Sequence, residues 1–371
     1  MRKVDLSYSW SAERDAGFIR NALMDLLHAV RAHGSISGAA QAVGLSYRHV
    51  WGELKRWEAE LGHALIVWEK GQPARLAPFG DKLLWAERQA QARLAPQVEA
   101  LRAELERAFA VAFDDSAQVL TLFASHDEGL TQLREFAVAQ ARLHLDVRFS
   151  GSVDAIAALN EGRCTVAGFH TPLSVQRGSL AEATYAPLLR PGLHKLMGFA
   201  TRSQGLLVAP GNPLGLRSLA DLRDKQARYV NRALGSGTRL LFDHLLAEAG
   251  VAPRDVRGHD RVESSHGAVA HAIAAGDADA GLGIEATARA QGVDFVPLVQ
   301  EHYWLVCLKD VLEEPPVRAL RALLQHDGWQ SVLRQLPGYE PWRSGEVLSL
   351  TEELPWWTLA PKRRAVRARR S

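Results

Sequence analysis

The hydrophobic positions of the first 80 residues repeat at helical spacing and are interrupted by glycines. The first apolar stripe consists of Leu23, Leu26, Leu27 and Val30. Gly34 ends this stripe, and Ser35 and Ser46 each precede another helical run, as helix N-caps do. The chain is therefore expected to begin with three helices, the second short and rich in small residues (36–43) and the third at about 47–61.

A different pattern follows the third helix. Two short apolar runs, 64–69 and 74–76, flank a turn at 70–73 and predict a small β-hairpin, or wing. From Asp81 to about Phe113 the chain is dense in Ala, Leu, Glu, Arg and Gln at helical spacing. A helix of about 30 residues spans about 45 Å, which favours pairing with another subunit. Pro96 is expected to kink or divide it.

Three helices and a wing in this order are the parts of a winged helix-turn-helix, a DNA-binding fold. The runs 34–40, 44–47 and 76–80, together with Trp51, resemble the ModE-type winged helix-turn-helix, a relative of the LysR-type regulators, over about residues 18–113. The resemblance implies that base edges are read by Ser46, Tyr47, Arg48 and His49. It implies phosphate contacts by Lys55, Arg56, Lys70 and Arg75. Trp51 and Trp57 also fit core positions, and Lys55 and Arg56 also fit an ordinary solvated face.

After residue 118 the period changes to alternating strands and helices. Apolar runs at 119–124, 146–149 and 165–170 each end in hydroxyl, small or imidazole residues, and helical stretches separate them. This alternation predicts an α/β module with a parallel sheet, whose ligands gather where the strands end.

The pattern restarts after residue 204 and predicts an anion site. A strand at 228–232 is followed by Gly235-Ser236-Gly237-Thr238-Arg239 at the start of a helix. Free backbone N–H groups at a helix start attract anions, and Arg232 and Arg239 add positive charge.

Residues 118–345 are similar to periplasmic-binding-protein-like domains of type 2 topology, and 229–239 with 278–285 resemble those fused to ModE-type segments and to molybdenum-cofactor proteins. The resemblance implies two lobes that close on an anion. The matching positions are Ser125, His126, Ser152, His170, Arg202, Arg232, Ser236, Thr238, Arg239, Ser265, His266 and Glu285. The carboxyl-terminal β-barrel repeat of ModE proteins is not found. The binding-protein resemblance implies an anionic effector, which is expected to be molybdate, tungstate or a molybdenum-cofactor-related molecule. No covalent cofactor is expected.

Charge is divided unevenly along the chain. Residues 1–113 carry a net charge of +2, residues 114–361 carry −6, and residues 362–371 carry +6. An acidic middle disfavours nucleic-acid binding there, whereas the two ends remain candidates. The sequence thus predicts a DNA-binding domain (1–80), a linker and dimerisation helix (81–117), a two-lobed effector domain (118–350) and a basic, disordered tail (351–371).

Composition excludes several classes of protein. A hydrophobic fraction of 47% without a long apolar run predicts a soluble, globular chain with no membrane span or secretion signal. Cys164 and Cys307 are the two cysteines, so a cytoplasmic protein without disulfides or a cysteine-rich metal site is expected.

The expected function is a one-component transcriptional regulator that acts as a homodimer or a dimer of dimers on double-stranded DNA. The sequence supports no catalytic residues, because the adjacent Ser125, His126 and Asp127 point in different directions on a strand end. The histidines lack zinc-ligand spacing. The alternatives are a carrier that does not bind DNA, or an enzyme acting on a molybdenum-cofactor intermediate.

Overall fold

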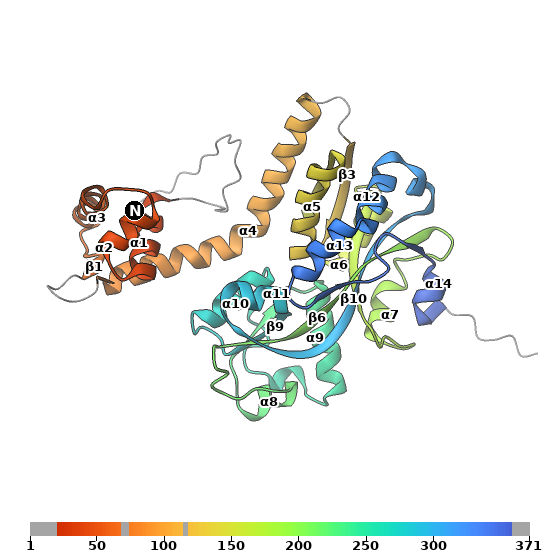
Figure 1. Cartoon of the computed structure of the whole chain (residues 1–371). Coiled ribbons are helices and arrows are strands. Elements are labelled where there is room, and N and C mark those ends of the chain that lie inside the picture. The colour runs from red at the N-terminus through yellow and green to blue at the C-terminus, as the bar shows by residue number, and fades with distance from the viewer. Residues whose placement is uncertain (1–20, 68–73, 114–117, 358–371) are drawn as a thin grey trace, which may run out of the picture. The chain divides into compact units, whose positions relative to one another are not determined.

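The computed structural model describes residues 21–67, 74–113 and 118–357 (Figure 1). These residues form two compact units, 1–91 and 92–371, and the boundary falls inside a long helix. Of the expected disordered tail (351–371), residues 351–357 are ordered, and Leu354 and Trp356 are buried in a hydrophobic core, so the prediction is wrong there. The rest of the tail and the expected turn at 70–73 lie outside the described residues.

The first unit has the expected three helices and hairpin. Its helices are α1 (Ala22–His33), α2 (Ile36–Ala42) and α3 (Tyr47–Leu61). The hairpin pairs β1 (Ile66–Val67) with β2 (Arg75–Leu76) in antiparallel fashion. The side chains of Ser35 and Ser46 cap α2 and α3, as the sequence predicts. The apolar stripe of α1 packs against Ala39 and Ala40 of α2 and against Val50 and Leu54 of α3.

Helix α4 (Pro78–Phe113) runs without interruption through Pro96, so of the two predicted effects of this proline, a kink or a division, the division does not occur. Proline removes one backbone hydrogen bond, and the turns on either side of it keep theirs. Helix α4 also begins three residues earlier than expected, because Pro78 suits the first turn of a helix, where no N–H partner is needed.

The second unit is built on one mixed sheet. Its strands are β3 (Gln118–Ala124), β4 (Leu143–Phe149), β5 (Val166–Pro172), β6 (His194–Val208), β7 (Tyr229–Arg232), β8 (Val262–Glu263), β9 (Ala280–Ile284), β10 (Asp294–Leu308), β11 (Tyr339–Pro341) and β12 (Val347–Leu348). The strand order is β4-β3-β5-β10-β6-β9-β7-β8, with β11 and β12 paired to β6.

The helices that cover this sheet follow most of its strands in the expected alternation. They are α5 (Glu128–Ala141), α6 (Ser152–Asn160), α7 (Leu180–Tyr185), α8 (Leu219–Asp224), α9 (Gly237–Glu248), α10 (His266–Ala274), α11 (Glu285–Gln291), α12 (Pro315–Gln325), α13 (Asp327–Gln335) and α14 (Leu350–Glu353). Figure 1 shows α5, α12 and α13 together on one lobe, and α8, α10 and α11 on the other.

The expectation of a parallel sheet is only partly right. Strands β3, β4 and β5 are parallel to one another, as are β7, β8 and β9. However, β6 and β10, each 15 residues long, run antiparallel to their neighbours and pass from one lobe to the other. A strand shared by two lobes must return across the junction, and the return is antiparallel.

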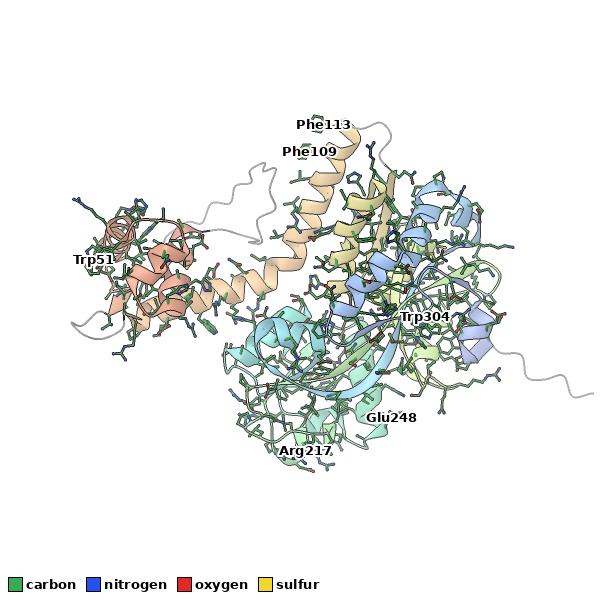
Figure 2. The ribbon with its side chains drawn as sticks, in the orientation of Figure 1. Trp51, Phe109, Phe113, Arg217, Glu248 and Trp304 are labelled. Atoms are coloured by element: carbon green, nitrogen blue, oxygen red, sulfur yellow. The ribbon has the colours of Figure 1, made fainter. Side chains whose placement is uncertain are left out.

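Each lobe has its own core. In the first lobe, Phe199 and Trp329 are buried on one face of the sheet, and Phe169 and Trp304 on the other. Figure 2 places Trp304 within this unit and Arg217 at the outer end of the second lobe. In the second lobe, Phe242 stacks on Tyr229 with ring centroids 4.3 Å apart. Two separate cores let the lobes behave as rigid bodies about β6 and β10.

Candidate DNA-binding and effector sites

The amino end of α3 is an exposed polar surface. Ser46, Tyr47, Arg48 and His49 are all exposed, and Ser46 also accepts a hydrogen bond from the His49 amide at 3.2 Å. The large exposed area of Tyr47 leaves its ring available for contact. These side chains are accessible for reading base edges, which is the role that the sequence predicts for them.

The predicted phosphate contacts differ in how free they are. Lys55 pairs with Glu58 at 2.7 Å, and Arg56 pairs with Glu53 at 2.6 Å. Their cationic groups also lie over the rings of Trp51 and Trp57, which are half-buried against the core. Arg75, on β2, is exposed, and Lys70 lies outside the described residues. Arg75 is therefore the better phosphate candidate of the described wing.

In the second unit, the predicted ligand residues come from strand ends and helix starts in both lobes. Ser125 follows β3, Ser152 begins α6, His170 lies on β5 and Arg202 on β6. From the second lobe, Arg232 ends β7, Thr238 lies in the first turn of α9, and His266 begins α10. All seven side chains are buried. The structure thus brings together most of the set that the sequence proposes.

Arg202 is part of a buried charge cluster. Its guanidinium donates to Glu301 Oε1 at 2.5 Å and to Asp127 Oδ2, and both carboxylates are buried. Tyr339 also donates its hydroxyl hydrogen to Asp127 Oδ2, at 2.5 Å. Although burial opposes it, the neighbouring carboxylates hold the pKa of Arg202 well above its usual range. Arg202 is thus neutralised by the protein itself, which leaves little of its charge for a ligand.

Arg232 is in the opposite situation. Only 4% of this residue is exposed, and none of the ion pairs among the described residues includes it. Its Nη2 donates to the carbonyl oxygen of Ser264 at 3.2 Å, while Nε and Nη1 have no hydrogen-bond partner. Burial, and then the charge of Arg202, lower the pKa of Arg232 to about 10. At neutral pH it is a buried cation without a countercharge, a costly arrangement that an anion would relieve.

Two histidines flank this cation in neutral form. His170 Nδ1 lies 3.5 Å from Ser152 Oγ, and His266 Nε2 lies 3.4 Å from Thr238 Oγ1. Burial, followed by the charges of Arg202 and Arg232, holds the pKa of both rings well below the usual range. The second nitrogen of each ring, His170 Nε2 and His266 Nδ1, has no partner. Each histidine therefore adds a neutral polar atom beside Arg232.

These neutral histidines predict acid lability. A histidine with a lowered pKa in the folded state stabilises the fold above its unfolded pKa of about 6.5, and this contribution is lost as the pH falls towards its folded pKa. We expect the free energy of unfolding to fall from pH 7 to pH 5 by up to about 1.4 kcal/mol per pH unit for each ring. Urea unfolding of the full chain measures this slope. His266→Gln should flatten the slope, whereas replacement of the exposed His63 should leave it unchanged.

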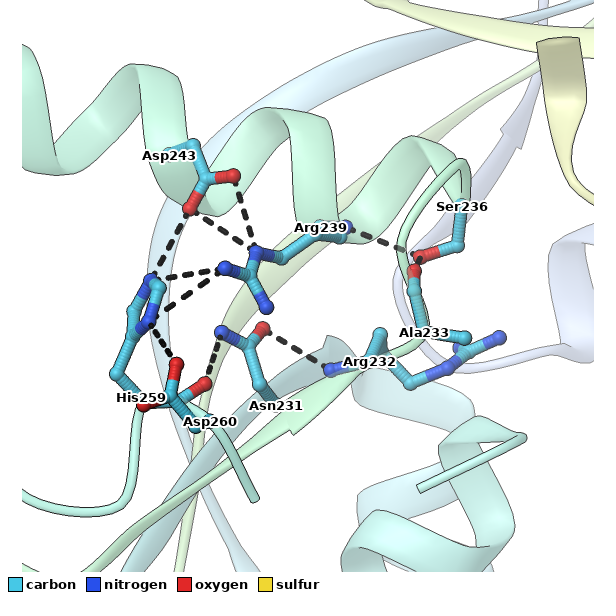
Figure 3. A network of polar contacts seen from close by, with 8 residues as sticks. All are labelled: Asn231, Arg232, Ala233, Ser236, Arg239, Asp243, His259 and Asp260. Carbon is cyan, nitrogen blue, oxygen red and sulfur yellow. Dashed lines mark hydrogen bonds and ion pairs between the residues drawn. The ribbon is translucent and has the colours of Figure 1, made fainter. Parts of the chain in front are cut away.

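Arg239 is used by the protein in a different network (Figure 3). Its Nε donates to both carboxylate oxygens of Asp243, at 3.1 and 3.0 Å, and its Nη2 lies 3.0 Å from His259 Nε2. In Figure 3 the guanidinium of Arg232 lies apart from this network. The structure therefore separates the two arginines that the sequence places together, and Arg232 is the one left available.

Glycines allow the lobes to approach each other at this point. A Cβ atom on Gly151 would lie 2.5 Å from the carbonyl oxygen of Gly235, and one on Gly237 would lie 3.1 Å from Ser152 Oγ. The amino ends of α6 and α9, which belong to different lobes, therefore lie close together. Both ends are electropositive, so their approach is easiest with an anion between or beside them.

The remaining predicted residues have structural partners. Ser236 and Ser265 cap α9 and α10 through their side-chain oxygens. Glu285 accepts a hydrogen bond from Arg289 at 3.3 Å. The half-buried ring of His126 packs on Phe149, with centroids 4.7 Å apart. His126 also contributes to lowering the pKa of His266, which indicates that the two imidazole rings lie near each other.

Sequence reasoning missed the carboxylates that neutralise Arg202. Asp127 directly follows two of the predicted ligand residues, Ser125 and His126, but is not among them, and Glu301 lies in no element that the sequence predicts. Gln204, whose Nε2 donates to Glu301 Oε1 at 2.8 Å, was also missed. Gln204 and Glu301 lie in strands β6 and β10, each of which contains further polar residues, so their polarity alone does not mark them. Their partners lie about 75 to 100 residues away or more, so no local pattern identifies them.

The described residues were compared with the requirements of metal sites, membrane spans and reactive cysteines. No group of three or more His, Cys, Asp or Glu side chains that could hold a metal ion occurs among them. None of the helices in the described ranges is both long enough and apolar enough to cross a membrane. Cys164 and Cys307 are both buried as free thiols, and burial raises their pKa to about 11 and about 12.

Two family models match the chain. Residues 133–325 match the PBP superfamily domain, and residues 22–81 match the bacterial regulatory helix-turn-helix proteins of the lysR family. The first of these ranges lies in the second unit (92–371) and the second range lies in the first unit (1–91). We call them the effector unit and the helix-turn-helix unit.

Similar proteins were found among sequences and solved structures. The uncharacterized protein YvgK of Bacillus subtilis is 31% identical over 201 residues, which are 54% of this chain and 64% of that protein. An uncharacterized protein from the ferredoxin 2Fe-2S gene 5' region of Clostridium pasteurianum is 30% identical over 111 residues, covering 30% of this chain and 98% of that protein. Full-length BenM has a TM-score of 0.43 and 14% identity over 86% of this chain and 98% of its own. Full-length CbnR in complex with its target DNA has a TM-score of 0.40 and 18% sequence identity. The match covers 81% of this chain and 98% of the CbnR chain.

Proposed function

This chain belongs to the PBP superfamily and carries a LysR-family helix-turn-helix, the domain pair of a LysR-type transcriptional regulator, and we propose that it senses a small anion in its cleft. In this proposal the chain is a cytoplasmic, one-component regulator. The first unit binds double-stranded DNA, and the second unit binds the effector between its two lobes.

Arg232 is the observation that carries the effector proposal. It is buried, has no carboxylate partner among the described residues, and keeps two unpaired donor groups. Ser125 Oγ, His170 Nε2 and His266 Nδ1 are also buried without partners. A bound oxyanion would accept hydrogen bonds from Arg232 and compensate its charge. The attraction between the two charges is stronger inside a protein than in water.

The pairing of the other arginines bears on which anion binds. Arg202 and Arg239 are already paired with carboxylates, so of the three arginines proposed from the sequence only Arg232 lacks an acidic partner. A single arginine with neutral hydroxyl and imidazole groups suits a compact oxyanion, and this supports molybdate or tungstate as effector. A molybdenum-cofactor-related molecule would need further cations for its phosphate.

A thermal-shift screen of the full chain tests the effector proposal. The candidates are molybdate, tungstate, sulfate, phosphate and a molybdenum-cofactor extract. A ligand at about 100 times its dissociation constant stabilises the folded state by about 2.7 kcal/mol. We expect a selective shift with molybdate or tungstate. A response to the extract alone would support the larger effector, and no response to any of these would contradict the proposal.

The exposed arginines of the first unit give a test of DNA binding. Arg48→Ala should cost about 1 to 3 kcal/mol at the operator and relax base preference, because arginine reads guanine through two hydrogen bonds. Arg75→Ala should weaken binding to all sequences about equally and lower the salt dependence, because it contacts phosphate. Fluorescence anisotropy with operator and scrambled duplexes at several salt concentrations measures both effects. Identical behaviour of the two variants would contradict the assigned roles.

The proposed working unit is a homodimer or a dimer of dimers held by α4, whose exposed apolar side chains include Leu94, Leu101 and Phe113. Figure 2 shows Phe109 and Phe113 near the carboxyl end of this helix. Two-fold symmetry would place the two recognition helices on half-sites about 34 Å apart, or a multiple of it. Closure of the lobes around the anion would change this spacing.

A further inference from the structure

The segment 263–266 contacts Arg232 on one side and helix α4 on the other. It contains the end of β8 and the start of α10. On the cleft side, Glu263 is the register partner of Arg232 in the parallel pairing of β7 with β8. The Arg232 guanidinium donates to the carbonyl oxygen of Ser264 at 3.2 Å, and His266 is one of the neutral rings beside it.

On its other side, the segment contacts the part of α4 that belongs to the second unit. The buried carboxylate of Glu263 accepts two hydrogen bonds from Arg93, at 3.1 Å from Nε and at 2.8 Å from Nη2. Ser265 Oγ donates to the carbonyl oxygen of Ala92 at 3.4 Å and accepts from the Ala268 amide at 3.1 Å. Both Ala92 and Arg93 fall inside the compact unit 92–371.

The two sides are connected through neighbouring residues of the backbone. Nη2 is the side-chain nitrogen of Arg232 that has a partner, the carbonyl oxygen of Ser264. The residues on either side of Ser264, Glu263 and Ser265, bond to α4. An anion bonded to the free Nε and Nη1 would draw the guanidinium towards itself, and Nη2 would pass this pull to the Ser264 carbonyl. A shift of Ser264 would in turn move its neighbour Glu263.

We propose that segment 263–266 is a latch through which occupation of the Arg232 site changes how firmly the effector unit holds α4. This inference rests on the proposed function, because it assumes that the ligand engages Arg232. Glu263 and Arg93 act here as positioning residues and do not touch the ligand.

Hydrogen exchange of the full chain, read by mass spectrometry in peptides covering residues 88–100, tests the latch. Glu263→Gln keeps the shape of the side chain and removes its charge, and we expect exchange in these peptides to rise about threefold or more. The matched control is Arg228→Gln. It removes an equally bidentate pair with Asp279 in the same lobe, and should leave the peptides unchanged.

Two further measurements connect the latch to the cleft. Arg232→Met should change exchange in residues 88–100 in the wild-type background, and have little effect in the Glu263→Gln background. Molybdate, used as the probe, should change the same peptides in the wild type and not in Glu263→Gln. The first measurement needs no ligand. If it succeeds while molybdate leaves the cleft peptides unchanged, the latch stands and the proposed anion fails. If Arg232→Met leaves α4 unchanged, or acts equally in both backgrounds, the latch is overturned.

Discussion

Replacing Arg232 with methionine is expected to remove the response to the anion and to stabilise the ligand-free protein. The guanidinium offers two unpaired donors, and a hydrogen bond to a charged group contributes about 1.5 to 3 kcal/mol. Loss of both should weaken the affinity for the anion by about a hundredfold or more. Methionine has nearly the same length and no charge to bury, so the free energy of unfolding without ligand should rise by about 1 to 3 kcal/mol.

Arg232→Lys is the matched control, because it keeps the charge and loses the planar fork. It should retain part of the anion response and should not stabilise the ligand-free protein. Isothermal titration with the anion found in the screen, together with urea unfolding, separates the two effects. If the methionine variant binds the anion as tightly as the wild type does, the anion site lies elsewhere.

Replacing Arg202 with methionine is expected to be the most destabilising of the changes considered. The variant leaves two buried carboxylates, Asp127 and Glu301, without their cation. Removing one member of a buried charge cluster costs about 3 to 5 kcal/mol, because the remaining charges stay uncompensated. Urea unfolding followed by tryptophan fluorescence should report this loss, since Trp304 and Trp329 lie in the cores of the same lobe.

A compensating variant keeps this prediction testable if Arg202→Met does not fold. Adding Asp127→Asn and Glu301→Gln to it removes the uncompensated charge, and should recover most of the lost stability. The control is Arg228→Gln at the half-exposed pair with Asp279, which should cost no more than about 1 kcal/mol. If Arg202→Met lowers the free energy of unfolding by no more than the control does, the buried charge cluster does not stabilise the fold.

Local chemistry made much of the fold predictable. Ser35 and Ser46 cap helices in the structure as they do in the pattern, and the apolar stripes of α1 and α3 meet in one core. Likewise, Ser125 after β3, His170 on β5 and Arg232 at the end of β7 are all buried, as polar residues that line a site would be. Caps and stripes are readable because each depends on residues within a few positions of one another.

The failures came where distant residues interact. Arg202, Arg232 and Arg239 look alike in the sequence, and each was proposed to bind the ligand. The partners of Arg202 are 75 and 99 residues away in the chain. Arg239 differs in part, because Asp243 is a local partner four residues along the same helix, whereas His259 is 20 residues away on a separate loop. The antiparallel course of β6 and β10 was missed for the same reason, since strand direction is set by pairing with distant strands.

The sequence by itself therefore determined the order of the elements, the helix-turn-helix, and the placing of polar residues at strand ends and helix starts. The tertiary structure alone decided which of three arginines keeps a free charge, and which segment lies between that charge and α4. The physical reason is that periodicity and capping are short-range, whereas the pairing of a buried charge depends on which side chains the whole fold brings within about 4 Å of it.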